Sequence, residues 1–155
     1  FPTRRSSDLD KNNTDFQMKL LSDASNLLNH SVKFIVKPHP SCPIKKSDYP
    51  EINLKIVDNP ISELIDDCAV VYTSCLTSAA LDAYYFGKNV LSARDPIGLN
   101  LSPLRGAKSA VSVSTGQELA DLLSNINKLN EPKSQVNDFF YLDHKLLKWK
   151  KLFNI

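Results

Sequence analysis

The chain has 155 residues, of which 42% are hydrophobic and 23% charged, with a formal net charge of +2. These values fit one globular domain and argue against a dedicated nucleic-acid binder, because such proteins carry a strongly basic face. No apolar run reaches the roughly 20 residues that a membrane-spanning helix needs. The three cysteines form no C-x-x-C pair, which favours a reduced cytoplasmic compartment and predicts that Cys68 and Cys75 are small core residues.

The first nine residues, Phe1–Leu9, resemble the translation of a common sequencing adapter. We therefore expect residues 1–9 to lie outside the fold, residues 10–131 to form the domain, and residues 132–155 to form a helical tail. On this interpretation the natural protein continues upstream, and the chain is its C-terminal part.

The first predicted helix covers Thr14–Asn29, where apolar residues recur at helical spacing and Thr14 with Gln17 makes a capping-box pattern. There follow, in chain order, a strand over Val32–Val36, a loop over 41–52, a strand over Leu54–Val57, a helix over Ile61–Asp67 and a strand over Ala69–Tyr72. The rest predicts a helix over Thr77–Phe86 ending at Gly87, a strand over Asn89–Ser92, a loop over Asp95–Lys108, a strand over Ala110–Val113, a helix from 115 or 116 to Lys128, and a last helix over Asp143–Phe153. This alternation predicts an α/β domain with a doubly wound parallel sheet of about five strands.

His39 is the candidate catalytic residue. It follows the strand that ends at Val36 and is held between Pro38 and Pro40, which restrict the backbone. Ligands of open α/β sheets bind outside the carboxyl ends of the strands, so an imidazole here could donate to a phosphate oxygen. A structural or merely exposed histidine is the alternative. Lys37 either neutralises phosphate or is a solvated charge at the strand end.

A run of hydroxyl side chains follows the third predicted strand, with Thr73, Ser74, Thr77 and Ser78 leading into a helix. Such a turn offers hydroxyls and unpaired backbone N–H groups to an anion. The alternative is that Thr77 or Ser78 only caps its own helix.

Two charged residues complete the candidate site. Asp82 lies one helical turn after Ser78, where its carboxylate either accepts the two hydroxyls of a ribose or simply faces solvent. Arg105, in an irregular loop, either contacts a phosphate or sugar carboxylate or pairs with a neighbouring Asp. His39 and Cys42 lie three residues apart, but no second pair stands at zinc-ligand spacing, so we expect no metal. The Walker and G-x-G-x-x-G patterns are also absent.

The motifs taken together resemble a known family. Strand-Lys37-Pro38-His39-Pro40, then Pro60-x-Ser62-Glu63-Leu64, then a strand with T-S-x-x-T-S-A-A-L-D-A-x-x-x-G-K-x-V (residues 73–90) resembles the C-terminal, donor-binding half of GT-B glycosyltransferases. The His-Pro and Ser/Thr motifs are similar to those of bacterial sialyltransferases and capsule enzymes. With Asn100–Gly106 and the tail included, the match resembles an uncharacterised group of bacterial surface-carbohydrate (O-antigen type) biosynthesis proteins.

This resemblance implies a Rossmann-like half of a GT-B fold, with a CMP- or UDP-type nucleotide sugar as substrate and no other cofactor. It implies that His39 contacts the donor phosphate, that Thr73, Ser74, Thr77 and Ser78 cradle phosphate, and that Asp82 binds ribose where many relatives have Glu. It further implies a glycan or lipid-linked acceptor, bound by an N-terminal domain upstream that also supplies the catalytic base, so this part alone should be inactive.

The tail and the location follow from the same resemblance. The last helix would pack back on the sheet or on the upstream domain, whereas Lys145, Lys148, Lys150 and Lys151 favour peripheral membrane contact. We expect a cytoplasmic protein, at the inner face of a bacterial membrane. The alternatives are a sugar-nucleotide epimerase or polyol-phosphate transferase with a similar half-domain, and a non-catalytic scaffold of polysaccharide assembly.

Overall fold

The computed structural model describes residues 6–28, 32–126, 129 and 147–153. Each predicted helix and strand has a counterpart there, with boundaries shifted by a few residues except at the first helix. The elements in chain order are α1 (Ser6–Leu27), β1 (Phe34–Val36), the short 3₁₀ helix η1 (Lys46–Asp48), β2 (Leu54–Ile56), α2 (Ile61–Leu64), β3 (Val70–Ser74), α3 (Ala79–Tyr85), β4 (Asn89–Ala93), β5 (Ala110–Val113), α4 (Gly116–Ser124) and α6 (Leu147–Phe153).

Helix α1 begins at Ser6 rather than at Thr14, so residues 6–9 are helical and Thr14 lies inside the helix. The predicted capping box is therefore wrong. The physical reason is that residues 6–13 contain neither Pro nor Gly, so nothing in them stops the helix from extending toward the N-terminus. The apolar face predicted for this helix is confirmed with one exception, since Leu27 is 55% exposed, and Met18 is buried in addition. The predicted face comprised Phe16, Leu20, Leu21, Ala24, Leu27 and Leu28.

The paired strands run parallel, as predicted, but they form two sheets. β1 pairs with β2, and β3, β4 and β5 form a second sheet in that order. The chain is thus an α/β fold with two small parallel sheets, and a single five-stranded sheet is not what the structure shows.

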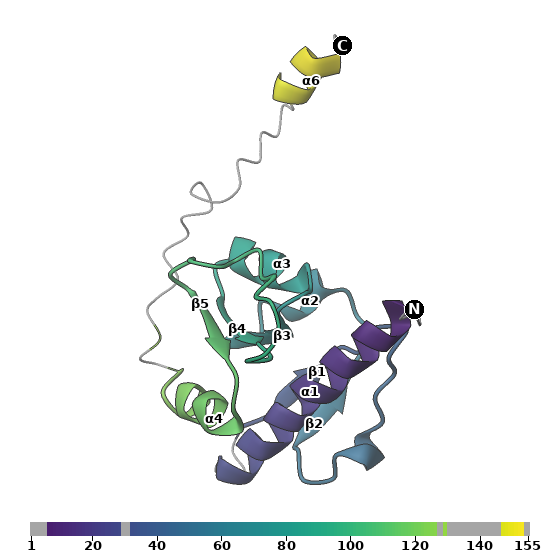
Figure 1. Cartoon of the computed structure of the whole chain (residues 1–155), viewed down its shortest axis with the longest axis vertical. Helices are drawn as coiled ribbons and strands as arrows, with labels where there is room; N and C mark the ends of the chain where they lie inside the picture. The colour runs from purple at the N-terminus through teal and green to yellow at the C-terminus, as the bar shows by residue number, and fades with distance from the viewer. Residues whose placement is uncertain (1–5, 29–31, 127–128, 130–146, 154–155) are drawn as a thin grey trace.

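Helices cover both faces of the three-stranded sheet (Figure 1). Because side chains alternate along a strand, Leu91 and Ala93 of β4 reach one apolar cluster with α1 and α4, whereas Val90 reaches a second cluster with α3. β4 lies in the middle of the sheet, and its residues from Val90 to Ala93 are buried. The smaller sheet adds Leu54 to the first cluster, and Phe34 and Val36 pack against it.

The loops at both ends of α3 and α4 are fixed by specific hydrogen bonds. Gly87, at φ 71°, ends α3 as predicted, with its N–H donating to the Tyr84 carbonyl and the Lys88 N–H to the Ala83 carbonyl. Thr115 caps α4 by accepting from the Glu118 N–H at 3.2 Å. These hydrogen bonds fix the end of α3 before β4 and the start of α4 after β5.

The tail contains α6 (Leu147–Phe153), so a helical segment at the end of the chain is confirmed. The start of the predicted segment at Asp143, and with it Lys145, lies outside the described residues. Lys150 and Lys151 are exposed, and the packing of this helix on the domain or on a membrane stays a prediction.

Candidate functional site

A hollow of about 370 Å³ lies at the carboxyl ends of β3 and β4. Three segments wall it, which are the N-terminal half of α1, the turn after β3, and the loop after β4. The lining residues are Asn12, Asn13, Phe16, Ser74, Cys75, Leu76, Ala93, Asp95, Gly98, Leu99 and Leu101. The hollow therefore lies on the sheet edge at which parallel α/β folds bind ligands.

Two of the predicted phosphate-binding residues, Thr73 and Ser74, are the last residues of β3 rather than part of the loop after it. The strand runs two residues longer than predicted because both pair with β4, Thr73 with Ser92 and Ser74 with Ala93. Thr73 is buried, and among the residues that the structure describes its hydroxyl has no hydrogen-bond partner. Ser74 lines the hollow, and its Oγ accepts from the Leu76 N–H at 3.3 Å.

The next two hydroxyls do different things. Thr77 Oγ1 accepts from the Ala79 N–H at 3.2 Å, so this side chain satisfies a backbone donor at the start of α3, as the capping alternative predicted. Ser78 is exposed and makes no side-chain cap bond. Asp82 is exposed on α3, consistent with its solvent-facing alternative, and it does not line the hollow.

The His39 motif lies at the end of β1 in the other sheet. The His39 ring is exposed, with Nδ1 2.6 Å from Ser41 Oγ and accepting from the Ser41 N–H at 3.3 Å. Because the backbone N–H can only donate, it assigns Nδ1 as an acceptor, which leaves the proton of the neutral ring on Nε2. Lys37 is exposed, and its ammonium donates to the Asp58 carbonyl at 3.2 Å.

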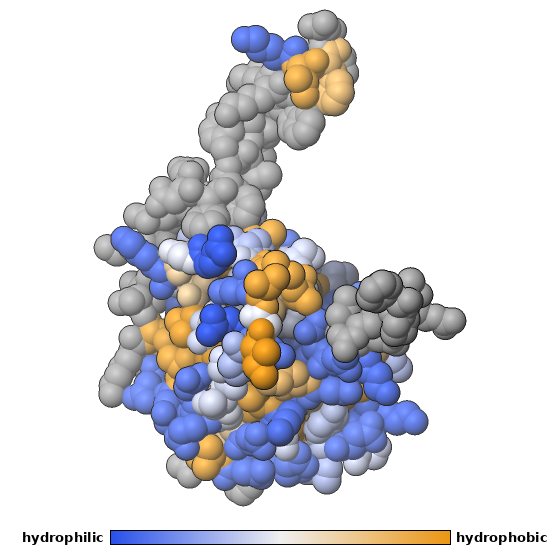
Figure 2. Space-filling model, viewed as in Figure 1, coloured by the Kyte–Doolittle hydropathy of each residue, from blue (hydrophilic) through white to orange (hydrophobic). Residues whose placement is uncertain are grey.

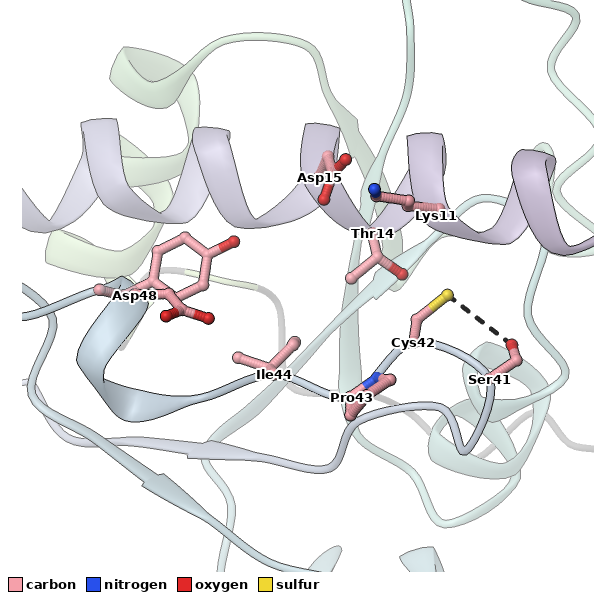
Figure 3. A pocket seen from close by; sticks show the side chains of 9 residues that line it. Lys11, Thr14, Asp15, Ser41, Cys42, Pro43, Ile44 and Asp48 are labelled. Carbon is pink, nitrogen blue, oxygen red and sulfur yellow. Dashed lines mark hydrogen bonds between the residues drawn. The ribbon is translucent and has the colours of Figure 1, made fainter.

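A second hollow, of about 390 Å³, lies beside the His39 motif (Figure 3). α1 contributes Lys11, Thr14 and Asp15, and the loop after β1 contributes Ser41, Cys42, Pro43, Ile44, Asp48 and Tyr49. Burial, followed by the nearby carboxylates of Asp15, Asp48 and Glu51, raises the pKa of the Tyr49 hydroxyl.

The two motifs are not joined in this structure. The α1 residues at the first hollow (12, 13 and 16) and at the second (11, 14 and 15) lie on roughly opposite sides of a helix with 3.6 residues per turn. Within the described part of the chain, no hydrogen bond links the His39 motif to residues 73–78. The predicted convergence of both motifs on one site stays a prediction.

Arg105 is exposed in a tight turn of the loop after β4. Its backbone N–H donates to the Ser102 carbonyl at 3.3 Å, and the buried Leu104 and Ala107 anchor the turn on either side. Gly106, at φ 89°, completes it. The turn is built mainly by its backbone and its apolar anchors, and among the described residues the Arg105 guanidinium has no partner Asp.

Two polar residues near this edge were missed by the sequence analysis. Ser92 is 3% exposed, and its hydroxyl has no hydrogen-bond partner within the described part of the chain. The same holds there for the buried Nε of Arg94, the residue directly after β4. The available signal was a serine and an arginine closing an otherwise apolar strand run, Val90-Leu91-Ser92-Ala93-Arg94.

The cysteines depart from the prediction, since Cys68 and Cys75 are only half-buried while Cys42 is buried. Cys68 lies just beyond α2 and donates to the Leu64 carbonyl at 3.2 Å, and Cys75 lines the first hollow. Among the described residues, no three His, Cys, Asp or Glu side chains gather closely enough to hold a metal ion. In the same part of the chain, every helix is too short or too polar to cross a bilayer.

Comparison of the chain with protein-family models, with curated proteins and with solved structures found no match.

Proposed function

We propose that this chain is the nucleotide-sugar-binding half of a glycosyltransferase in bacterial surface polysaccharide biosynthesis. The observation that carries the proposal is the hollow at the carboxyl ends of β3 and β4, the edge at which open parallel sheets bind ligands. Two motifs of the resemblance supply parts of its wall, through Ser74 to Leu76 and through Leu101. The acceptor-binding domain and the catalytic base would lie upstream.

The proposal includes a finer fold, in which the two sheets are parts of one doubly wound, Rossmann-like sheet with β1 beside β3. Two observations support it: every strand pairing within the two sheets is parallel, and Val36 of β1 and Tyr72 of β3 pack against the same apolar cluster. The chain would then turn to opposite sides of the sheet after β1 and after β3. Such a switch point is where nucleotides bind, and it would bring His39 and Ser74 to one crevice.

In this proposal His39 acts on the donor phosphate. Nε2 carries the proton of the neutral ring, so it can donate to a phosphate oxygen and offset the negative charge that develops as the acceptor attacks the anomeric carbon. Lys37, Ser78 and Asp82 are exposed and available to the rest of the nucleotide, with Asp82 toward ribose.

Exposed apolar residues in the loop after β4 support the proposal that the acceptor is linked to a lipid. Ile97 is 96% exposed, Leu99 83% and Leu101 62%, and the latter two also line the hollow. Figure 2 shows apolar side chains gathered on one face of the domain among hydrophilic ones. An apolar rim at the mouth of the hollow suits a lipid chain and a place at the inner membrane face.

A thermal-shift panel with CMP, CDP, UDP and GDP tests the proposal. A nucleotide at about a hundred times its Kd stabilises the folded state by about 2.7 kcal/mol, which for a chain of this length raises Tm by about 5 to 10 °C. We expect one nucleotide to do so, and His39→Ala to reduce the shift.

The matched control is Lys55→Ala, an exposed residue on the outward face of β2, which should leave the shift unchanged. If the chain melts cooperatively and no nucleotide changes its Tm, the proposal fails in favour of a non-catalytic scaffold.

A further inference from the structure

Three buried side-chain polar atoms lack a hydrogen-bond partner in the described part of the chain: Thr73 Oγ1, Ser92 Oγ and Arg94 Nε. All three belong to the carboxyl ends of two adjacent strands, β3 and β4. Buried polar groups are nearly always paired, because an unpaired one costs folding free energy. Their gathering at one place therefore needs an explanation.

The three side chains leave the same face of the sheet. Thr73 and Ser92 are register partners, so their side chains point the same way. Arg94 is two residues beyond Ser92, and its N–H still donates to the Val113 carbonyl at 2.8 Å, so the strand geometry continues to it. This face is opposite to that of Leu91 and Ala93, which pack in the cluster with α1 and α4.

The nearest acidic neighbour in sequence does not neutralise Arg94. Asp95 Oδ1 accepts from the Ile97 N–H at 2.9 Å, which ties this carboxylate into its own turn. Among the described residues, Arg94 Nε thus stays without a hydrogen-bond partner, as do the two buried hydroxyls.

We infer that Arg94, Thr73 and Ser92 bind a phosphate group. A guanidinium fork binds two oxygens of an oxyanion, and the two hydroxyls can both donate to a third. A terminal phosphate offers three oxygens and a carboxylate only two, so the set of donors fits phosphate better. The inference rests on the proposed function for the identity of the phosphate, which would belong to the nucleotide-sugar donor. Ser74 and Ala93 line the first hollow from the opposite face of the sheet, so the donor would pass over the carboxyl ends of β3 and β4 to place its phosphate at Arg94. The inference gives the phosphate contact to Arg94 instead of Arg105.

Isothermal titration of the 155-residue chain with inorganic phosphate and with pyrophosphate tests the site directly, with acetate as the carboxylate arm. We expect phosphate or pyrophosphate to bind and acetate not to. Arg94→Gln should raise the Kd by about tenfold or more, the usual effect of losing a charged hydrogen bond. The matched control Arg105→Gln, an exposed arginine on the same loop, should change the Kd less than about twofold. Absence of phosphate binding, or equal losses in both variants, would overturn the inference.

The double variant Thr73→Val and Ser92→Ala separates binding from structure. It removes two hydroxyls that have no partner in the protein, so without phosphate its Tm should stay the same or rise. Its Kd for phosphate should rise about fivefold or more. A lower Tm with unchanged phosphate affinity would mean that the hydroxyls are structural, and the inference would fail.

The two proposals fail in different ways. If a nucleotide shifts Tm but inorganic phosphate does not bind, the donor-binding proposal stands and the Arg94 site is wrong. If phosphate binds through Arg94 but no nucleotide shifts Tm, the site stands and the proposed function is wrong.

Discussion

The substitution Gly116→Ala tests the close packing of α1 against α4. α1 also forms part of the wall of the first hollow. Gly116 is buried at the first position of α4, where a Cβ atom would overlap Asp23 Cβ and lie 3.1 Å from the Ala24 N and 3.2 Å from the Asp23 C of α1. Two of these three atoms are backbone, so a rotamer change cannot relieve the contact. Gly116→Ala must push the two helices apart.

The magnitude follows from two opposing effects. Forcing one extra methyl into a packed interior costs about 1 to 3 kcal/mol, whereas replacing Gly by Ala in a helix gains at most about 1 kcal/mol. We expect a net loss of about 1 to 2 kcal/mol, which for a chain of this length lowers Tm by about 2 to 8 °C. Urea unfolding followed by circular dichroism measures the free energy directly.

The control is Gly98→Ala, where the nearest atom to a new Cβ is Asp95 Cβ at an ordinary 3.4 Å. This exposed loop substitution should change the free energy of unfolding by less than about 0.5 kcal/mol. If Gly116→Ala proves as stable as the wild type, or more stable, the close approach of α1 and α4 is incorrect.

Two further predictions concern titrating groups. Burial raises the pKa of Tyr72, whose hydroxyl donates to the Gln17 carbonyl at 3.0 Å, so the neutral form is favoured in the fold and stability is lost as the pH rises above the unfolded value of about 10. Alkaline unfolding should therefore begin at a higher pH in Tyr72→Phe than in the wild type. If both proteins lose stability over the same alkaline pH range, this prediction is wrong. The hydrogen bond from Ser22 lowers the pKa of the Glu51 carboxyl. The stability that this ionised carboxylate contributes is therefore present above the pKa of Glu51 in the unfolded chain, and it is lost as the pH falls through the pKa in the folded state. In Ser22→Ala an NMR titration should show the Glu51 pKa returning upward, and an unmoved value would show that the bond is not formed in solution.

Elements with strong local signals could be predicted from the sequence. β5 has the predicted bounds. Gly87 ends α3 where expected, because a positive φ and a terminating turn are local properties of the chain. The N-terminus of α1 could not be placed, since Thr14 and Gln17 satisfy a capping pattern that a longer helix does not use. The division into two sheets was also missed, because pairing between strands depends on contacts that are distant in sequence.

The candidate site shows the same division. The position of Ser74 at the carboxyl edge followed from reading a strand before it, and the structure confirms it in the wall of a hollow. Ser92 and Arg94 carried no motif, and only the pairing of β4 with β3 sets them beside Thr73. The sequence analysis chose Arg105 because it lies in a long irregular loop, but the structure shows this residue exposed.

The sequence by itself determined the order of helices and strands and the α/β class with parallel strand pairing, because periodicity and turn residues act over a few positions. Only the tertiary structure decided which hydroxyls are buried without a partner among the described residues, which arginine has a buried, unpartnered Nε, and on which side of α1 each hollow lies. These properties arise from register and packing between segments far apart in the chain, and no local pattern encodes them.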